Sequence, residues 1–382
     1  MPEDYDFDAA IAHRSNRVRE IVLFLKETES RRFVAAMREP LPALIDLELT
    51  GWNFVEELVL PDGFLLGSTR HLRRFYLRYI SFPALPTFLL SATGLVDLGL
   101  INIPGSGFFT PETLVAGLAV VTNLKSLVVG FQSESAPRLF DRFDPNPPGT
   151  RIVLPALTRF RFRWKSEYLE YLVARIDAPL LDSFKIVFLN QFVFNLPELG
   201  NFMRRTTSFQ ALNEARMDFR ENSILVKSLP SARTFDEESG LIFICKVPVW
   251  HLSYLAETLS SLFPSIYIVE HLYIYGPRDL FTFWEDEVDD TRWLETFRPF
   301  TAVKDLYLHK EIAQCIAPAL QELVEERATY ALPALKRIFL EGLETSGPVE
   351  EAIGQFVAAR QLLGRPVALS RWLTETEGLY LC

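Results

Sequence analysis

A short apolar phrase, Leu-x-x-Leu-x-Leu with other apolar residues at some positions, returns along the whole chain. The copies begin at uneven intervals, from 23 residues between Leu72 and Leu95 to 34 residues between Val269 and Val303. Such a period is typical of a stacked array, in which each unit touches only its neighbours. The repeat therefore predicts an array of similar units and argues against a globule built around one central core.

Each copy has apolar residues at its first, fourth and sixth positions. The copies are Leu44-Leu47-Leu49, Leu72-Phe75-Leu77, Leu95-Leu98-Leu100, Leu124-Leu127-Val129, Leu157-Phe160-Phe162, Leu181-Phe184-Ile186, Leu212-Ala215-Met217, Val269-Leu272-Ile274, Val303-Leu306-Leu308 and Leu335-Ile338-Leu340. A forerunner lies at Val18-Ile21-Leu23, and a further copy falls within residues 241–247, where its register is ambiguous. We count about twelve repeats on this basis.

The phrases alternate between apolar and other residues, and this period of two predicts short strands. The segments between them favour helices. Residues 166–176 place apolar side chains on one helical stripe, and Thr110 followed by Pro111 is typical of a helix start. Further helices are expected at 196–202, 251–263, 291–297, 317–326 and 349–363. The fold class is therefore α/β: a leucine-rich-repeat solenoid, a ribonuclease-inhibitor-like curved array with parallel strands on the concave face and helices outside.

We expect one continuous solenoid over residues 14–373 with capping ends, an N-terminal tail over 1–13 and a C-terminal tail over 374–382. Polar, turn-rich stretches at 132–150 and 228–240 predict loops. In regular leucine-rich repeats, the position eight residues after the first Leu often holds Asn or Cys. That position is apolar in several copies here, so the repeats are degenerate. The residues at that position are Trp52, Ile80, Ile103, Leu189 and Leu343.

The composition of the chain argues against several classes of function. The 382-residue chain carries a formal net charge of −10, which argues against general affinity for nucleic acid. No apolar stretch has the roughly 18 residues of a membrane span, and the acidic start lacks the apolar core of a signal peptide. Three cysteines without metal-type spacing fit a reducing compartment. We therefore expect a monomer of the cytosol or nucleus that binds neither nucleic acid nor membrane.

Several phrases resemble a family of F-box/leucine-rich-repeat proteins from mushroom-forming fungi. They lie at 39–49, 89–98, 153–162, 178–182, 299–308 and 356–361. The resemblance implies a protein-interaction module like the substrate-recognition part of an F-box ubiquitin-ligase subunit. The chain departs from the family pattern, because the 17 residues before Val18 are too few for an F-box. It resembles the repeat portion alone, and a ligase adaptor is expected as a partner only if an F-box is encoded upstream.

The motifs that could carry chemistry all have structural alternatives. Gly105-Ser-Gly107 lacks the remaining residues of a phosphate-binding loop and favours a turn. The acidic run 285–290 lacks the spacing of a calcium loop. The five histidines have no metal-type spacing, and Cys245 lies in an apolar run typical of an inert core thiol. The sequence therefore predicts no enzymatic activity and no cofactor.

The strand positions between the consensus residues point to the opposite face of the sheet. In this acidic chain they hold many Arg and Tyr residues, the types enriched in interface hot spots. We predict a protein-binding face for a target with an acidic or phosphorylated segment; the alternatives are ordinary solvated strand residues, or a stand-alone scaffold or inhibitor without a ligase link. The predicted face comprises Arg74, Tyr76, Arg78, Arg159, Arg161, Arg163, Lys185, Arg216, His271, Tyr273, Tyr275, Tyr307, His309 and Phe339.

Overall fold

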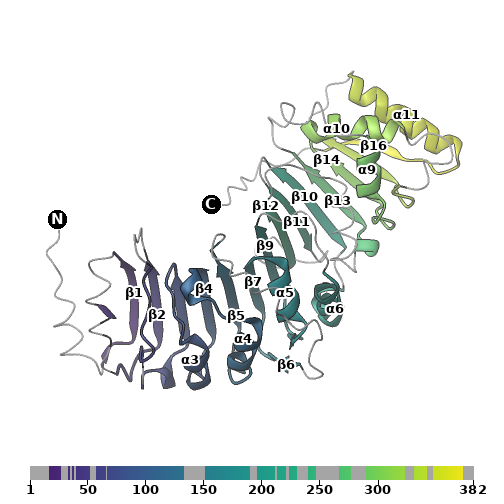
Figure 1. The fold of residues 1–382 in the computed structure, drawn as a ribbon. Helices are drawn as coiled ribbons and strands as arrows, with labels where there is room; N and C mark the ends of the chain where they lie inside the picture. Colours follow the sequence, from purple (N-terminus) through teal and green to yellow (C-terminus); the bar gives the residue numbers. More distant parts are fainter. Residues whose placement is uncertain are drawn as a thin grey trace. The chain divides into compact units, whose positions relative to one another are not determined.

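The structure is a computed structural model, and its ribbon is drawn in Figure 1. The chain divides into two compact units, which we call unit 1 (Met1–Leu189) and unit 2 (Asn190–Cys382). The prediction of one continuous solenoid over 14–373 stays a prediction. The structure describes residues 17–26, 33–34, 37, 40–51, 57–65, 67–132, 151–189, 196–210, 213–220, 223–229, 240–246, 266–276, 290–322, 331–341 and 347–372.

In unit 1, the repeat phrases form parallel strands that follow one another in sequence order, as predicted. The strands are β1 (Glu20–Leu25), β2 (Asp46–Gly51), β3 (Arg74–Arg78), β4 (Asp97–Ile103), β5 (Ser126–Phe131), β7 (Arg159–Trp164) and β9 (Ser183–Leu189). Two short strands, β6 (Ile152–Val153) and β8 (Ile176–Asp177), pair in a separate parallel sheet.

The helices of unit 1 are α3 (Leu85–Ser91), α4 (Pro111–Leu118) and α5 (Ser166–Val173). Helix α4 begins as predicted, because the Thr110 hydroxyl accepts a hydrogen bond from the backbone N–H of Thr113 at 3.3 Å. Helix α5 is shorter than predicted. Ile176 leaves the helix to pair with Ile152 in the small sheet, so the apolar stripe of this segment serves a helix and then a strand.

In unit 2, the strand order is β12-β11-β10-β13-β14-β15-β16. From β10 through β13 to β16 the neighbours are parallel, whereas β10, β11 and β12 form an antiparallel meander. The strands are β10 (Glu214–Arg220), β11 (Ser223–Leu229), β12 (Gly240–Lys246), β13 (His271–Tyr275), β14 (Asp305–Leu308), β15 (Arg337–Glu341) and β16 (Ala368–Trp372). The helices are α6 (Pro197–Arg205), α9 (Asp290–Phe297), α10 (Lys310–Gln321) and α11 (Pro348–Leu362).

The meander corrects the prediction of parallel strands throughout. Only two residues separate β10 from β11, a length that permits a hairpin, whereas a parallel pair needs a dozen or more. The copy within 241–247 is therefore a strand that runs against β11. The predicted loop 228–240 is also wrong at its ends, because Ser228 belongs to β11 and Gly240 to β12.

Other boundaries differ by smaller amounts. Helix α10 begins at Lys310, before the predicted 317, and α6, α9 and α11 lie within three residues of their predicted bounds. Strand β16 was not predicted as a strand, because its sequence lacks the repeat phrase. The predicted helix 251–263 and both predicted tails lie outside the described residues, as does the stretch 133–150 of the first predicted loop.

The core is made by the consensus positions. Leu47, Leu98 and Leu306 are fully buried, as predicted. Neighbouring strands bring equivalent side chains into contact: the rings of Phe160 and Phe184 stack with centroids 4.9 Å apart. Because each consensus residue packs against its equivalents on the two adjacent strands, the repeat in sequence becomes a continuous apolar layer.

The turn at Gly105-Ser-Gly107 is a single 3-10 turn, η3 (Gly105–Gly107), as the sequence favoured. The Ser106 hydroxyl hydrogen-bonds the buried Ser81 hydroxyl at 2.6 Å and the carboxylate of Glu57. A Cβ atom added at Gly107 would lie 2.8 Å from the Cα of Ser81. The glycine is therefore explained by close packing of this turn against the segment that contains Ser81.

We expect the substitution Leu98→Ala to lower the free energy of unfolding by about 2–5 kcal/mol, because it opens a cavity in a fully buried layer. Denaturant titration measures the change. Leu90→Ala is the matched control: Leu90 is 54% exposed on α3, and its truncation should change stability by less than about 0.5 kcal/mol. Equal losses for the two variants would contradict the assignment of Leu98 to the core.

Candidate protein-binding face

In each unit, one face of the strands is covered by helices. Phe75 of β3 packs on Phe88 of α3 at 4.6 Å, and Phe219 of β10 packs on Trp293 of α9 at 5.5 Å between ring centroids. The intervening strand residues point to the other side, which we call the open face. All the described residues of the predicted binding face that lie within strands occupy these intervening positions.

The open face of unit 1 carries a row of basic side chains on β7. Arg159 and Arg163 are exposed and Arg161 is half-buried, alternating with buried aromatic residues. Lys185 of β9 lies in register beside Arg161. Arg159 forms an ion pair with Asp97 of β4 at 3.5 Å, across one intervening strand. We call Arg159, Arg161, Arg163 and Lys185 the basic row.

A second group lies on β3. The guanidinium of Arg74 is 5.6 Å from the centre of the Tyr76 ring, and Arg78 is exposed at the end of the strand. A Cβ atom added at Gly99 would lie 2.2 Å from the Tyr76 ring, so that ring lies flat against the backbone of β4. Strands β4 and β5 separate this group from the basic row, so the predicted residues of unit 1 form two groups on one face.

The open face of unit 2 carries stacked aromatic rings. Tyr273, Tyr307 and Phe339 are in register on β13, β14 and β15. Their ring centroids are 4.2 and 4.4 Å apart, with interplanar angles of 10° and 5°. We call these three residues the aromatic shelf. Its first ring lies under the guanidinium of Arg216, at 5.1 Å.

Trp372 completes the aromatic group, and the sequence analysis did not predict it. It ends β16, and its ring centroid lies 5.9 Å from Tyr273, 5.8 Å from Tyr275 and 5.4 Å from Tyr307. The interplanar angles of 60° to 70° are those of edge-to-face packing. No repeat phrase marks β16, so the sequence offers only a lone Trp near the end of the predicted solenoid.

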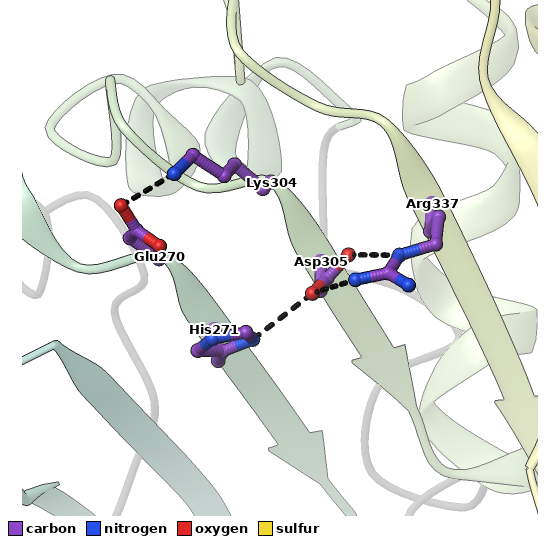
Figure 2. Close-up of polar contacts among 5 residues, drawn as sticks. All are labelled: Glu270, His271, Lys304, Asp305 and Arg337. Atoms are coloured by element: carbon purple, nitrogen blue, oxygen red, sulfur yellow. Dashed lines mark hydrogen bonds and ion pairs between the residues drawn. The ribbon is translucent and has the colours of Figure 1, made fainter. Parts of the chain in front are cut away.

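A buried carboxylate organises the neighbouring charges (Figure 2). The Asp305 side chain is 2% exposed and accepts two hydrogen bonds from Arg337, at 2.6 and 2.7 Å. The Nδ1 atom of His271 lies 3.0 Å from the same carboxylate. Beside this group, Lys304 donates to Glu270 at 2.5 Å. Asp305 and Arg337 are in register with His271 at open-face positions, but the sequence analysis did not include them in the predicted face.

His309 follows β14 and precedes α10. Its Nδ1 atom is 2.5 Å from Glu311, and its Nε2 atom is 2.9 Å from Glu341 of β15. Both predicted histidines therefore lie against carboxylates of their own unit. Their primary contacts are internal, whereas the shelf presents half-buried rings on the open face.

Burial controls the ionisation of Tyr275 and of the two shelf tyrosines, Tyr273 and Tyr307. It raises the pKa of Tyr275 to about 12 and raises the pKa of Tyr273 and of Tyr307 above the ordinary value of 10.0. Nearby carboxylates, Glu214 first among them at Tyr273, act in the same direction. The phenols are therefore neutral hydrogen-bonding groups over the physiological range of pH.

Burial disfavours the thiolate form of the two cysteines within the described residues. Cys245 is buried, as predicted for a core thiol, and burial raises its pKa to about 12. Burial likewise raises the pKa of Cys315 to about 11. Among the described residues, no group of His, Cys, Asp and Glu has the arrangement of a metal site. Within the same part of the chain, no helix is long and apolar enough to cross a membrane.

No protein-family model and no curated protein matches the chain. Among solved structures, it is similar to the leucine-rich repeat-containing protein LegL7 from Legionella pneumophila. The match covers 87% of this chain and 97% of that one, with 15% sequence identity and a TM-score of 0.35. The leucine-rich-repeat assignment accordingly rests on the strands, helices and buried consensus positions of this chain, and the likeness to fungal F-box proteins stays a prediction.

We expect Arg337→Ala to lower the midpoint of thermal unfolding of unit 2, because the buried carboxylate of Asp305 loses its two strongest hydrogen bonds. Lys336→Ala, which removes the neighbouring exposed charge, is the matched control and should leave the midpoint unchanged. The double variant Arg337→Ala/Asp305→Ala should recover part of the loss, since no carboxylate is then left unpaired. A double variant less stable by the sum of the two single losses would contradict this coupling.

The raised pKa values of Tyr275 and of the shelf tyrosines predict a loss of folding stability at alkaline pH. A phenol whose pKa is raised by folding stays neutral in the native state while it ionises in the unfolded chain, so its contribution is complete below pH 10.0 and is lost as pH rises toward 12 and above. Unfolding titrations across this window should show a smaller loss for Tyr275→Phe than for the unsubstituted chain. Tyr267→Phe, at an exposed tyrosine, is the control and should follow the unsubstituted chain.

Proposed function

We propose that the chain is a protein-interaction module that binds its target on the open face of its strands and performs no chemistry. The observation that supports this most directly is the division of each unit into a face closed by helices and a face that presents Arg and aromatic side chains. Arg, Tyr and Trp are the types enriched in binding hot spots. Repeat folds use such extended faces for binding.

The basic row suits an acidic or phosphorylated segment. Alternate residues of one strand lie about 7 Å apart, and an extended peptide has the same spacing between its own alternate side chains. A peptide lying along β7 would therefore bring an acidic residue at every second position against Arg159, Arg161 and Arg163. Each guanidinium can hold a carboxylate or phosphate with two parallel hydrogen bonds. Asp97 neutralises part of the row through its ion pair with Arg159.

The ligase-linked form of this function rests on the resemblance of the repeat phrases to fungal F-box proteins. In that form the chain would recognise substrates for a ubiquitin ligase; in the alternative it is a stand-alone scaffold or inhibitor. Co-purification from the source cell separates the two forms. Recovery of the cullin-ligase adaptor with the chain favours the first, and recovery of a target without the adaptor favours the second.

We expect the triple variant Arg159→Ala/Arg161→Ala/Arg163→Ala to bind an extended peptide with glutamate at alternate positions about tenfold or more weakly than the unsubstituted chain. Fluorescence anisotropy at two salt concentrations measures both the affinity and its salt dependence, which should fall together because charges carry the binding. A phosphoserine version of the peptide should bind more tightly than the glutamate version.

The control variant removes the same charge elsewhere in unit 1. Arg70, Arg73 and Lys125 are exposed and lie outside the strands, so replacing these three by Ala should leave peptide affinity nearly unchanged. Equal effects of the two triple variants would show that net charge, and not the basic row, attracts the peptide. Unchanged affinity in both would remove the basic row from the binding site.

A further inference from the structure

We propose that the aromatic shelf of unit 2 is a binding site for a tryptophan side chain of the partner, and that the chain's own Trp372 occupies this site in the free protein. The inference rests on the proposed function, because it names the chemistry of a partner for the open face. It adds a second contact point, on a different unit from the basic row, and it makes the last described strand a removable cover.

The packing of Trp372 supplies the geometry of the bound ligand. The three shelf rings lie nearly parallel, and the indole plane is inclined by 60° to 70° to Tyr273 and Tyr307 of the shelf and to Tyr275 beside it. Because both faces of Tyr307 are stacked against Tyr273 and Phe339, the indole contacts the edge of that ring. Edge-to-face contact sets the positive ring edge against a negative ring face and is favourable beyond burial alone. The indole comes from β16, whereas the rings it covers lie on β13 and β14. It is thus a side chain docked on the face from another strand.

Strand β16 is weakly held. Within the described part of unit 2 it pairs only with β15, and three of its five residues are exposed, including Leu369 at 38%. Val367, just before the strand, is its nearest buried apolar anchor. By contrast, β13 and β15, which carry the two outer rings of the shelf, bury every second residue in the core. An edge segment with few buried contacts opens at low cost, so β16 can leave while the core stays intact.

The surroundings of the shelf favour tryptophan over phenylalanine or tyrosine. Asp218, which accepts two hydrogen bonds from Arg220, lies in register beside Tyr275, and Glu341, which is 2.9 Å from Nε2 of His309, lies in register beside Trp372. A carboxylate has about four acceptor sites, so both side chains retain acceptor capacity in the row where the indole sits. An indole N–H is a donor only, which such acceptors suit. At the other end of the shelf, Arg216 is ion-paired with Glu214 at 2.7 Å, so a tryptophan side chain alone is the proposed ligand.

The test uses the full chain and N-acetyl-tryptophanamide as the probe, observed by saturation-transfer NMR. Trp372→Ala should bind the probe saturably, with a dissociation constant of about 0.1–10 mM for a ligand of this size. The unsubstituted chain should bind it at least about tenfold more weakly, because its site is filled. N-acetyl-leucinamide, an apolar probe without a ring, should bind neither protein.

Shelf variants localise the binding. Trp372→Ala/Tyr307→Leu keeps an apolar side chain but removes the central ring, and it should lose the probe; Trp372→Ala/Tyr267→Phe is the matched control and should keep it. Thermal unfolding checks that each variant is folded, and Trp372→Ala/Phe339→Leu replaces the Tyr307 variant if that one does not fold. Equal probe binding by the unsubstituted chain and Trp372→Ala, or undiminished binding after loss of the shelf ring, would overturn the proposal.

A second measurement needs no probe. Loss of the indole exposes Tyr273, Tyr275 and Tyr307, so phenolate absorbance should develop at lower pH in Trp372→Ala than in the unsubstituted chain, and Trp372→Phe should restore most of the difference. Identical titration curves would show that Trp372 does not cover the shelf. Probe binding and phenolate titration do not depend on the basic row. A negative acidic-peptide test in unit 1 therefore does not affect the conclusion on Trp372, and a negative result for Trp372 does not affect the conclusion on the basic row.

Discussion

The structure depends on the burial of one face of every strand against its equivalents on the neighbouring strands. A strand alone cannot bury Leu98 or Phe160; the layer exists because each copy of the repeat covers the copy before it. This constraint fixes which side chains remain for function. Once the consensus positions are committed to the core, the alternate positions must face the other way, and only there can Arg161 or Tyr307 meet a partner.

Periodicity was sufficient to predict the strands of the main sheet of unit 1, because each strand of a parallel array repeats the same spacing of buried residues. Leu47 and Leu98 were placed in the core by spacing alone, and the structure buries both completely. The spacing of apolar residues failed to predict the structure at β11 and at Ile176. Strand β11 was missed because its alternation of Ile224 and Val226 follows a two-residue gap, where hairpin closure decides the pairing direction. Ile176 was assigned to a helix because an apolar residue fits a helical stripe and a buried strand equally well.

The sequence predicted which face of the strands carries the candidate site, but it did not predict the contacts between the side chains. The alternation of apolar residues placed Tyr273, Tyr307 and Phe339 on the same face, and the rings stack because the three strands are in register. Trp372 could not be found this way, because it reaches the shelf from a strand without a repeat phrase. Alternation places Asp305 on the open face, but only the positions of Arg337 and His271 explain its burial. Contacts between rows depend on side-chain length and rotamer, which a one-dimensional pattern does not encode.

Because β10, β11 and β12 are antiparallel, strands at this place in unit 2 can be gained or lost only in pairs if the array is to keep its direction. A parallel repeat can be gained or lost singly, because the next strand still runs the same way. Strands β11 and β12 reverse direction twice, so β12 again runs with β10 and β13. Deleting one of them would leave a strand pointing against the array, whereas deleting both would preserve the direction of the strands. Insertions at this place must therefore come in pairs, and a shortened relative that keeps the parallel order should lack β11 and β12 together.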